Sequence, residues 1–113
     1  MESSIIELFL PEGILDYFVV TSAEKAQTHY VISLEEKNLH PEEFIGQRLS
    51  SKGYFESVNV NDFPIRGKAC YLKVKRRRWL NEDTNKIVSR DWKLVAKGTR
   101  MTQEFATFLK GMH

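Results

Sequence analysis

The chain has 113 residues, of which 42% are hydrophobic and 28% are charged. This length and composition are typical of one globular domain, residues 1–113, and exclude a multi-domain enzyme and a disordered tail. The one cysteine, Cys70, has no partner for an intramolecular disulfide, which favours a reducing compartment. The longest apolar run, Tyr17 to Val20, is far shorter than the ~18 residues of a membrane span, and the N-terminus lacks the basic flank of a secretory signal. We therefore expect a cytoplasmic protein with no membrane partner.

The net charge of +2 conceals a strong asymmetry along the chain. Residues 1–63 hold four basic and eleven acidic side chains, a net charge of −7, whereas residues 64–113 hold thirteen basic and four acidic ones, a net charge of +9. Such asymmetry indicates contact of the basic half with nucleic acid or another polyanion. The alternative is that the two halves pack together and neutralise each other, and composition favours neither.

The acidic half predicts a short helix followed by a β-hairpin. Ser4 to Glu7 has the pattern of a capping box, which begins a helix that ends before Gly13. Residues 14–21 and 28–34 are rich in the β-branched and aromatic residues that strands favour, and a polar stretch separates them. Farther along, residues 41–49 are able to form another short helix.

The basic half predicts three strands and a final helix. Residues 55–63 form one strand, and residues 68–79 and 87–95 form a second hairpin. The last helix carries one apolar stripe, made of Met101, Phe105, Phe108, Leu109 and Met112, which is expected to cover one face of the sheet. The predicted fold class is α+β: a small antiparallel sheet of two hairpins and an extra strand, with a short N-terminal helix and an amphipathic C-terminal helix.

The segment from Lys73 to Trp79 is the strongest candidate for a functional surface. With the two-residue period of a strand, one face presents Lys73, Lys75 and Arg77 between Tyr71 and Trp79. Successive charges on this face are ~6.8 Å apart. Such a row can meet DNA phosphates, which are spaced ~3.4 Å along each strand, and a two-stranded ribbon can enter the major groove. The candidate nucleic-acid-binding residues are Lys73, Lys75, Arg76, Arg77, Arg78, Trp79, Arg90, Lys93, Lys97 and Arg100.

The same segment has a purely structural interpretation. Strands rich in lysine and arginine are often edge strands that their charges protect from aggregation. Both tryptophans are also compatible with a role in the core of a small sheet, and we predict this role for Trp92 because it alternates with Val88 and Leu94.

No constellation in the sequence predicts catalysis. His29, His40 and His113 are too far apart to form a helical metal site, and no Gly-rich phosphate-binding loop occurs. Cys70 has no nearby histidine in the sequence and is expected to be a small core residue. We expect no enzymatic activity, no metal site and no cofactor.

Residues 58–68 and 71–79 resemble the N-terminal region of bacterial insertion-sequence transposases. The shared pattern is a strand, an Asp-aromatic-Pro turn, a glycine, and a strand of alternating apolar and basic residues that ends in Arg-aromatic. Residues 94–105 resemble the stretch that leads to the rest of those proteins, and residues 10–15 match more loosely. Many relatives carry zinc-ribbon cysteines after the Arg-aromatic pair, where this chain has Leu80-Asn81-Glu82-Asp83.

The resemblance implies a DNA-binding module that recognises the terminal repeats of a mobile element, here through a basic β-hairpin. A separate RNase-H-like domain with acidic metal ligands, which this chain lacks, would cut and join the DNA. One alternative is a protein-interaction or oligomerisation module that docks a separate catalytic subunit or a second copy of the chain, through the acidic half or the apolar stripe of the last helix. The other is a remnant without function.

Overall fold

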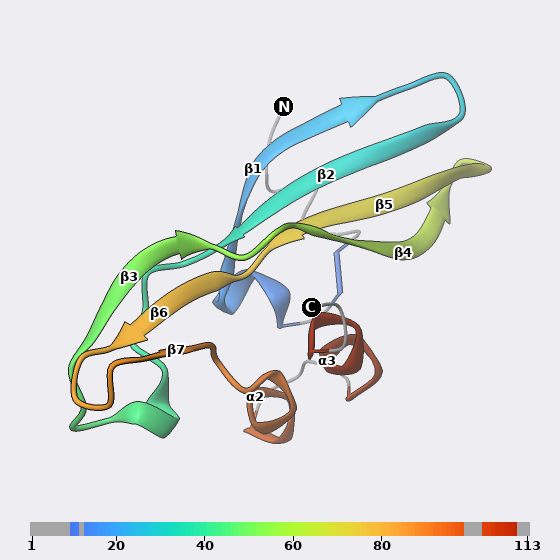
Figure 1. Ribbon diagram of the computed structural model, residues 1–113. Coiled ribbons are helices and arrows are strands. Elements are labelled where there is room, and N and C mark those ends of the chain that lie inside the picture. Colours follow the sequence, from blue (N-terminus) through green and yellow to red (C-terminus); the bar gives the residue numbers. More distant parts are fainter. Residues whose placement is uncertain (1–9, 12, 99–102, 111–113) are drawn as a thin grey trace.

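The computed structural model describes residues 10–11, 13–98 and 103–110, in which seven strands form two sheets beside two α-helices (Figure 1). The α+β class predicted from the sequence is confirmed. The predicted N-terminal helix from Ser4 falls almost wholly outside the described residues. The strands are β1 (Phe18–Lys25), β2 (His29–Glu36), β3 (Leu49–Tyr54), β4 (Val58–Ile65), β5 (Lys68–Lys75), β6 (Arg77–Asn81) and β7 (Lys86–Val88), and the helices are α2 (Trp92–Gly98) and α3 (Gln103–Lys110).

The larger sheet has four strands in the order β1-β2-β5-β4. The hairpin β1-β2 confirms the first predicted hairpin, although β1 begins at Phe18 because Ile14–Asp16 form a turn of 3-10 helix. Strand β5 pairs in parallel with β2 and antiparallel with β4. The hairpins β1-β2 and β4-β5 join through β2 and β5, which run in the same direction. The prediction of a purely antiparallel sheet is therefore wrong.

The turn between β4 and β5 is tighter than the sequence suggested. The predicted turn covered residues 62–67, but β4 continues to Ile65 and pairs with Lys68 across a turn of only Arg66 and Gly67. Both turn residues have positive φ, 52° and 79°, as two-residue hairpin turns of the I′ type require. Pro64 is tolerated because β4 is an edge strand and its register shifts between Asp62 and Ile65.

The predicted strand 68–79 is divided at Arg76 between two sheets. Its second part, β6, pairs with β3 and β7 in a three-stranded antiparallel sheet. Arg76 itself is buried, with its guanidinium 5.1 Å from the ring centroid of Phe55. The prediction of one continuous strand is wrong because the chain changes partner strands at this residue.

The last predicted strand, 87–95, is also wrong beyond Val88, because α2 begins at Trp92. The carboxylate of Asp91 accepts the backbone N–H groups of Lys93 and Leu94 at 3.1 and 3.2 Å, which supplies partners to the free donors at the helix start. The helix turns Trp92, Val95 and Ala96 into the core. Trp92 is therefore a core residue as predicted, but it lies on a helix.

Helices α2 and α3 both lie on one face of the four-stranded sheet (Figure 1). Phe105 and Leu109 of α3 are buried in the same core as Leu34 and Leu72 of the sheet. This confirms that the last helix covers the sheet. Because Phe105 and Leu109 are buried in the core, these two members of the apolar stripe do not offer a docking surface to another subunit.

Candidate nucleic-acid interface

The alternation predicted for the basic strand holds along β5. Cys70, Leu72 and Val74 point into the core, whereas Lys73 and Lys75 are exposed on the other face. The alternation continues to the buried Arg76 and fails beyond it. Trp79 is buried and Arg78 is exposed, the reverse of the prediction, because β6 belongs to the second sheet and presents a different side to the core.

Arg77 is committed to contacts inside the protein. Its Nη1 donates to the Ser51 hydroxyl at 2.6 Å, and its Nη2 donates to the Glu36 carbonyl and the Tyr54 hydroxyl at 3.0 and 3.1 Å. Its Nε donates to the Lys37 carbonyl at 3.2 Å. The guanidinium also lies 4.9 Å from the ring centroid of Tyr54. These contacts join the two sheets and leave few donors for a phosphate.

Glu36 holds Arg90 in the interior. The Arg90 Nε donates to the Glu36 carboxylate at 3.1 Å, and the two side chains are only 3% and 1% exposed. The same carboxylate accepts the backbone N–H of Arg77 at 2.7 Å. Burial raises the pKa of Glu36, and the contacts with Arg77 and Arg90 oppose this rise. Burial also lowers the pKa of Arg76, and the charge of Glu36 opposes that shift.

The ten predicted site residues therefore do not form one outward surface. Arg76, Trp79 and Arg90 are buried and Arg77 is half-buried among partners. The interpretation in which the two halves neutralise each other holds for Arg90, which forms an ion pair with Glu36. Arg100 lies outside the described residues. The remaining five are exposed but separated: Lys73 and Lys75 on β5, Arg78 on β6, and Lys93 and Lys97 on α2, which packs on the opposite face of the sheet.

The face of the four-stranded sheet that turns away from both helices is the best candidate for a binding surface (Figure 1). We call it the open face. Its register forms transverse rows, and in the row of Lys73 the neighbours on β2 and β4 are Ser33 and Asn59, with Ser22 of β1 next to Ser33. Its side chains include the apolar Val19 and Val31 and the polar or charged Thr21, Ser22, Glu24, His29, Ser33, Glu35, Asn59, Asn61, Tyr71, Lys73 and Lys75.

A shallow hollow of about 140 Å³ lies on the open face, lined mainly by Thr21, Ser22, Ser33, Lys73 and Lys75. The hydroxyl groups of Ser22 and Ser33 and the two ammonium groups supply the hydrogen bonds and the positive charge that a phosphate requires, whereas the Thr21 hydroxyl donates to the Ser33 carbonyl at 3.3 Å. Glu35 also lines the hollow, with its carboxylate 3.9 Å from the Lys75 Nζ, and both side chains are partly exposed. Lys75 is thus partly neutralised, whereas no ion pair of Lys73 is found among the described residues.

Sequence reasoning missed the buried charges and the hydroxyl groups of the open face. A signal for the buried charges was present, because Glu36 continues the apolar alternation Ile32-Leu34 and Arg76 continues Leu72-Val74. Charged residues at the end of two such alternations indicate a buried cluster of opposite charges. The hydroxyl groups of Thr21, Ser22 and Ser33 gave no such signal.

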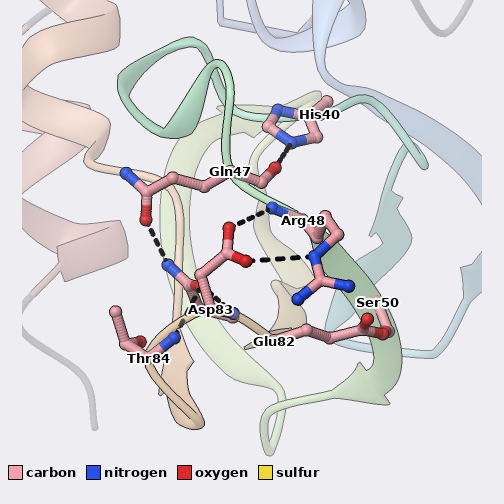
Figure 2. A network of polar contacts seen from close by, with 8 residues as sticks. His40, Gln47, Arg48, Ser50, Glu82, Asp83 and Thr84 are labelled. Atoms are coloured by element: carbon pink, nitrogen blue, oxygen red, sulfur yellow. Dashed lines mark hydrogen bonds and ion pairs between the residues drawn. The ribbon is translucent and has the colours of Figure 1, made fainter.

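A polar network holds the turn between β6 and β7 (Figure 2). The Asn81 side chain accepts the backbone N–H groups of Asp83 and Thr84 at 2.9 and 3.3 Å and donates to Gln47 Oε1 at 2.5 Å. The Asp83 carboxylate accepts the backbone N–H and Nε of Arg48 at 2.9 and 3.0 Å, and these bonds lower the pKa of Asp83.

Replacing Asn81 by alanine is expected to lower the free energy of unfolding by about 1–3 kcal/mol, because the amide is buried and its three hydrogen bonds are lost. Urea denaturation followed by tryptophan fluorescence measures this change. Thr84→Ala is the matched control, since its side chain is exposed and a change within about 0.5 kcal/mol is expected. An Asn81→Ala protein as stable as the unmodified chain would show that this amide does not hold the turn.

Within the described residues, no group of three or more His, Cys, Asp or Glu side chains is placed to hold a metal ion. No helix in the same part of the chain is long and apolar enough to cross a membrane. No protein-family model matches the sequence, and no curated protein or solved structure was found to be similar to it. The candidate interface therefore rests on its own geometry.

Proposed function

We propose that this chain is a DNA-binding module of a transposase and that it holds DNA phosphates on the open face. The observation that carries the proposal is the position of Lys73. It is exposed at the centre of the open face, which none of the described helices covers, and its neighbours in the register are the uncharged hydrogen-bonding side chains of Ser33 and Asn59. A cation attracts an anion more strongly when its direct cross-strand neighbours are uncharged, and the nearby Glu35 carboxylate lies in the row of Lys75.

The choice of DNA as the anion is supported by the segment that carries the resemblance to transposases. Residues 58–79 cover β4, β5 and the first half of β6, so the β4-β5 hairpin with Lys73 and Lys75 falls within this segment. Recognition of the terminal repeats of a mobile element is the role that the resemblance implies, and a separate chain or domain would supply catalysis.

Replacing Lys73 by alanine is expected to weaken binding to mixed-sequence DNA and to make it less dependent on salt. Each phosphate contact that is lost reduces the slope of log K against log salt by about 0.9 for duplex DNA and about 0.7 for single strands. Fluorescence anisotropy with a labelled oligonucleotide at several salt concentrations measures both quantities. Lys86→Ala is the control, because Lys86 is exposed on β7 of the other sheet and should leave the slope unchanged.

A substitution at Glu35 is expected to have the opposite effect and to strengthen DNA binding. Glu35→Gln removes the carboxylate that lies 3.9 Å from Lys75, so it should strengthen binding by up to about fivefold, the worth of an exposed ion pair. A Lys73→Ala protein with the salt slope of the unmodified chain, together with a Glu35→Gln protein of unchanged affinity, would exclude the open face as the phosphate-binding surface.

A further inference from the structure

We propose that the open face binds single-stranded DNA in preference to duplex DNA. This inference rests on the proposed function, because it specifies the form of DNA that the same surface takes. Three features of the face support it: the width of the sheet, an aromatic pair beside the lysines, and the order of these groups along β5.

The sheet is too wide to enter a groove of duplex DNA. The basic strand β5 lies between β2 and β4, and β1 lies beyond β2. Four strands spaced ~4.8 Å apart span roughly 14 Å between their outermost axes, before the side chains are added. The major groove is only ~12 Å wide and admits one helix or a two-stranded ribbon. The two-stranded basic ribbon expected from the sequence therefore cannot carry Lys73 and Lys75 into the groove.

Next to Lys73 the open face carries two aromatic rings. Tyr71 of β5 and His29 of β2 are in contact, with ring centroids 5.4 Å apart and planes at 71°. Both side chains are half-buried, so part of each ring surface meets the solvent. Bases stack on rings of this kind only when they are not already stacked in a duplex. An aromatic pair on the open face thus favours a single strand.

The order of the groups along β5 fits a strand of nucleic acid that runs over the face. Tyr71, Lys73 and Lys75 follow each other at every second residue, ~6.8 Å apart. A base on Tyr71 would leave the neighbouring backbone phosphate beside Lys73 and the hydroxyl-lined hollow. Asn61 stands opposite Tyr71 and Asn59 opposite Lys73, where their amides can bond base edges or phosphate oxygens.

The test compares one labelled oligodeoxynucleotide of about 16 nucleotides and mixed sequence, as a single strand and as its duplex, by fluorescence anisotropy at constant salt. The element's own sequence is not needed, since stacking on an aromatic ring tolerates every base. We expect tighter binding of the single strand. Tyr71→Ala should weaken this binding by about fivefold or more, whereas Tyr71→Phe, which keeps the ring, should retain it. Circular dichroism and a thermal melt of each variant establish that it is folded.

Duplex binding as tight as single-strand binding, or single-strand binding that Tyr71→Ala does not change in a folded protein, would overturn the preference and leave the proposed DNA-binding function standing. If neither form of the oligonucleotide binds at low salt, the proposed function itself fails. If Tyr71→Ala proves unfolded, the ratio of single-strand to duplex affinity of the unmodified chain decides whether the preference exists. In that case Tyr71→Phe should keep this ratio, and Lys73→Ala should weaken binding of both forms.

Discussion

Replacing Glu36 by alanine is expected to lower the free energy of unfolding by about 3–5 kcal/mol. The carboxylate is 1% exposed and holds both the Arg90 guanidinium and the backbone N–H of Arg77. Its removal leaves the buried Arg90 Nε and the backbone N–H of Arg77 without their acceptor. Because domains of this size are stable by only about 5–15 kcal/mol, this loss is a large part of the total. Chemical denaturation at neutral pH, followed by tryptophan fluorescence, measures it.

Glu36→Gln is the informative partner variant, because an amide oxygen can still accept the Arg77 N–H but carries no charge. The folded-state pKa of Glu36 is raised by burial from the ordinary value of 4.5, so its ionisation is less favourable in the folded than in the unfolded protein. Its contribution to stability is therefore full below that value and declines as pH rises through the raised pKa. Glu36→Gln should lack this decline and should be less harmful than Glu36→Ala. Equal losses in both variants at all pH values would contradict this account.

Replacing Trp92 by alanine is expected to destabilise the fold by about 3–5 kcal/mol, the range for deletion of a large buried aromatic side chain. Trp92 is 1% exposed, stacks on Phe18 of β1 with ring centroids 5.1 Å apart, and meets the edge of Tyr17 at 5.8 Å. The indole therefore attaches α2 to the start of the four-stranded sheet. A thermal melt by circular dichroism, together with urea denaturation, gives the change.

Leu94→Ala on the same helix is the control, because Leu94 is 49% exposed and a change within about 0.5 kcal/mol is expected. If Leu94→Ala were as destabilising as Trp92→Ala, helix formation itself and not the packing of the indole would limit stability. If neither variant changed stability, α2 would not be an essential part of the core.

Local patterns in the sequence predicted the elements in which each face stays buried or exposed along the whole element. The β1-β2 hairpin follows from its β-branched and aromatic content, and the inward face of β5 follows from Cys70, Leu72 and Val74 at every second position. Phe105 and Leu109 mark the buried stripe of α3 in the same way. In each of these cases the period of hydrophobic residues reports directly on burial, so no knowledge of distant partners was needed.

Partners distant in sequence decided everything else. A run such as Lys75 to Trp79 looks continuous along the chain, and only the exchange of β2 and β4 for β3 and β7 as neighbours leaves Arg78 exposed and buries Trp79. The parallel pairing of β2 with β5 joins residues about forty positions apart. Glu36 meets Arg90 across an even longer separation. The sequence determined how much charge each half carries, but whether a given cation faces a carboxylate or the solvent depends on tertiary proximity, which determines the local field and desolvation of each group.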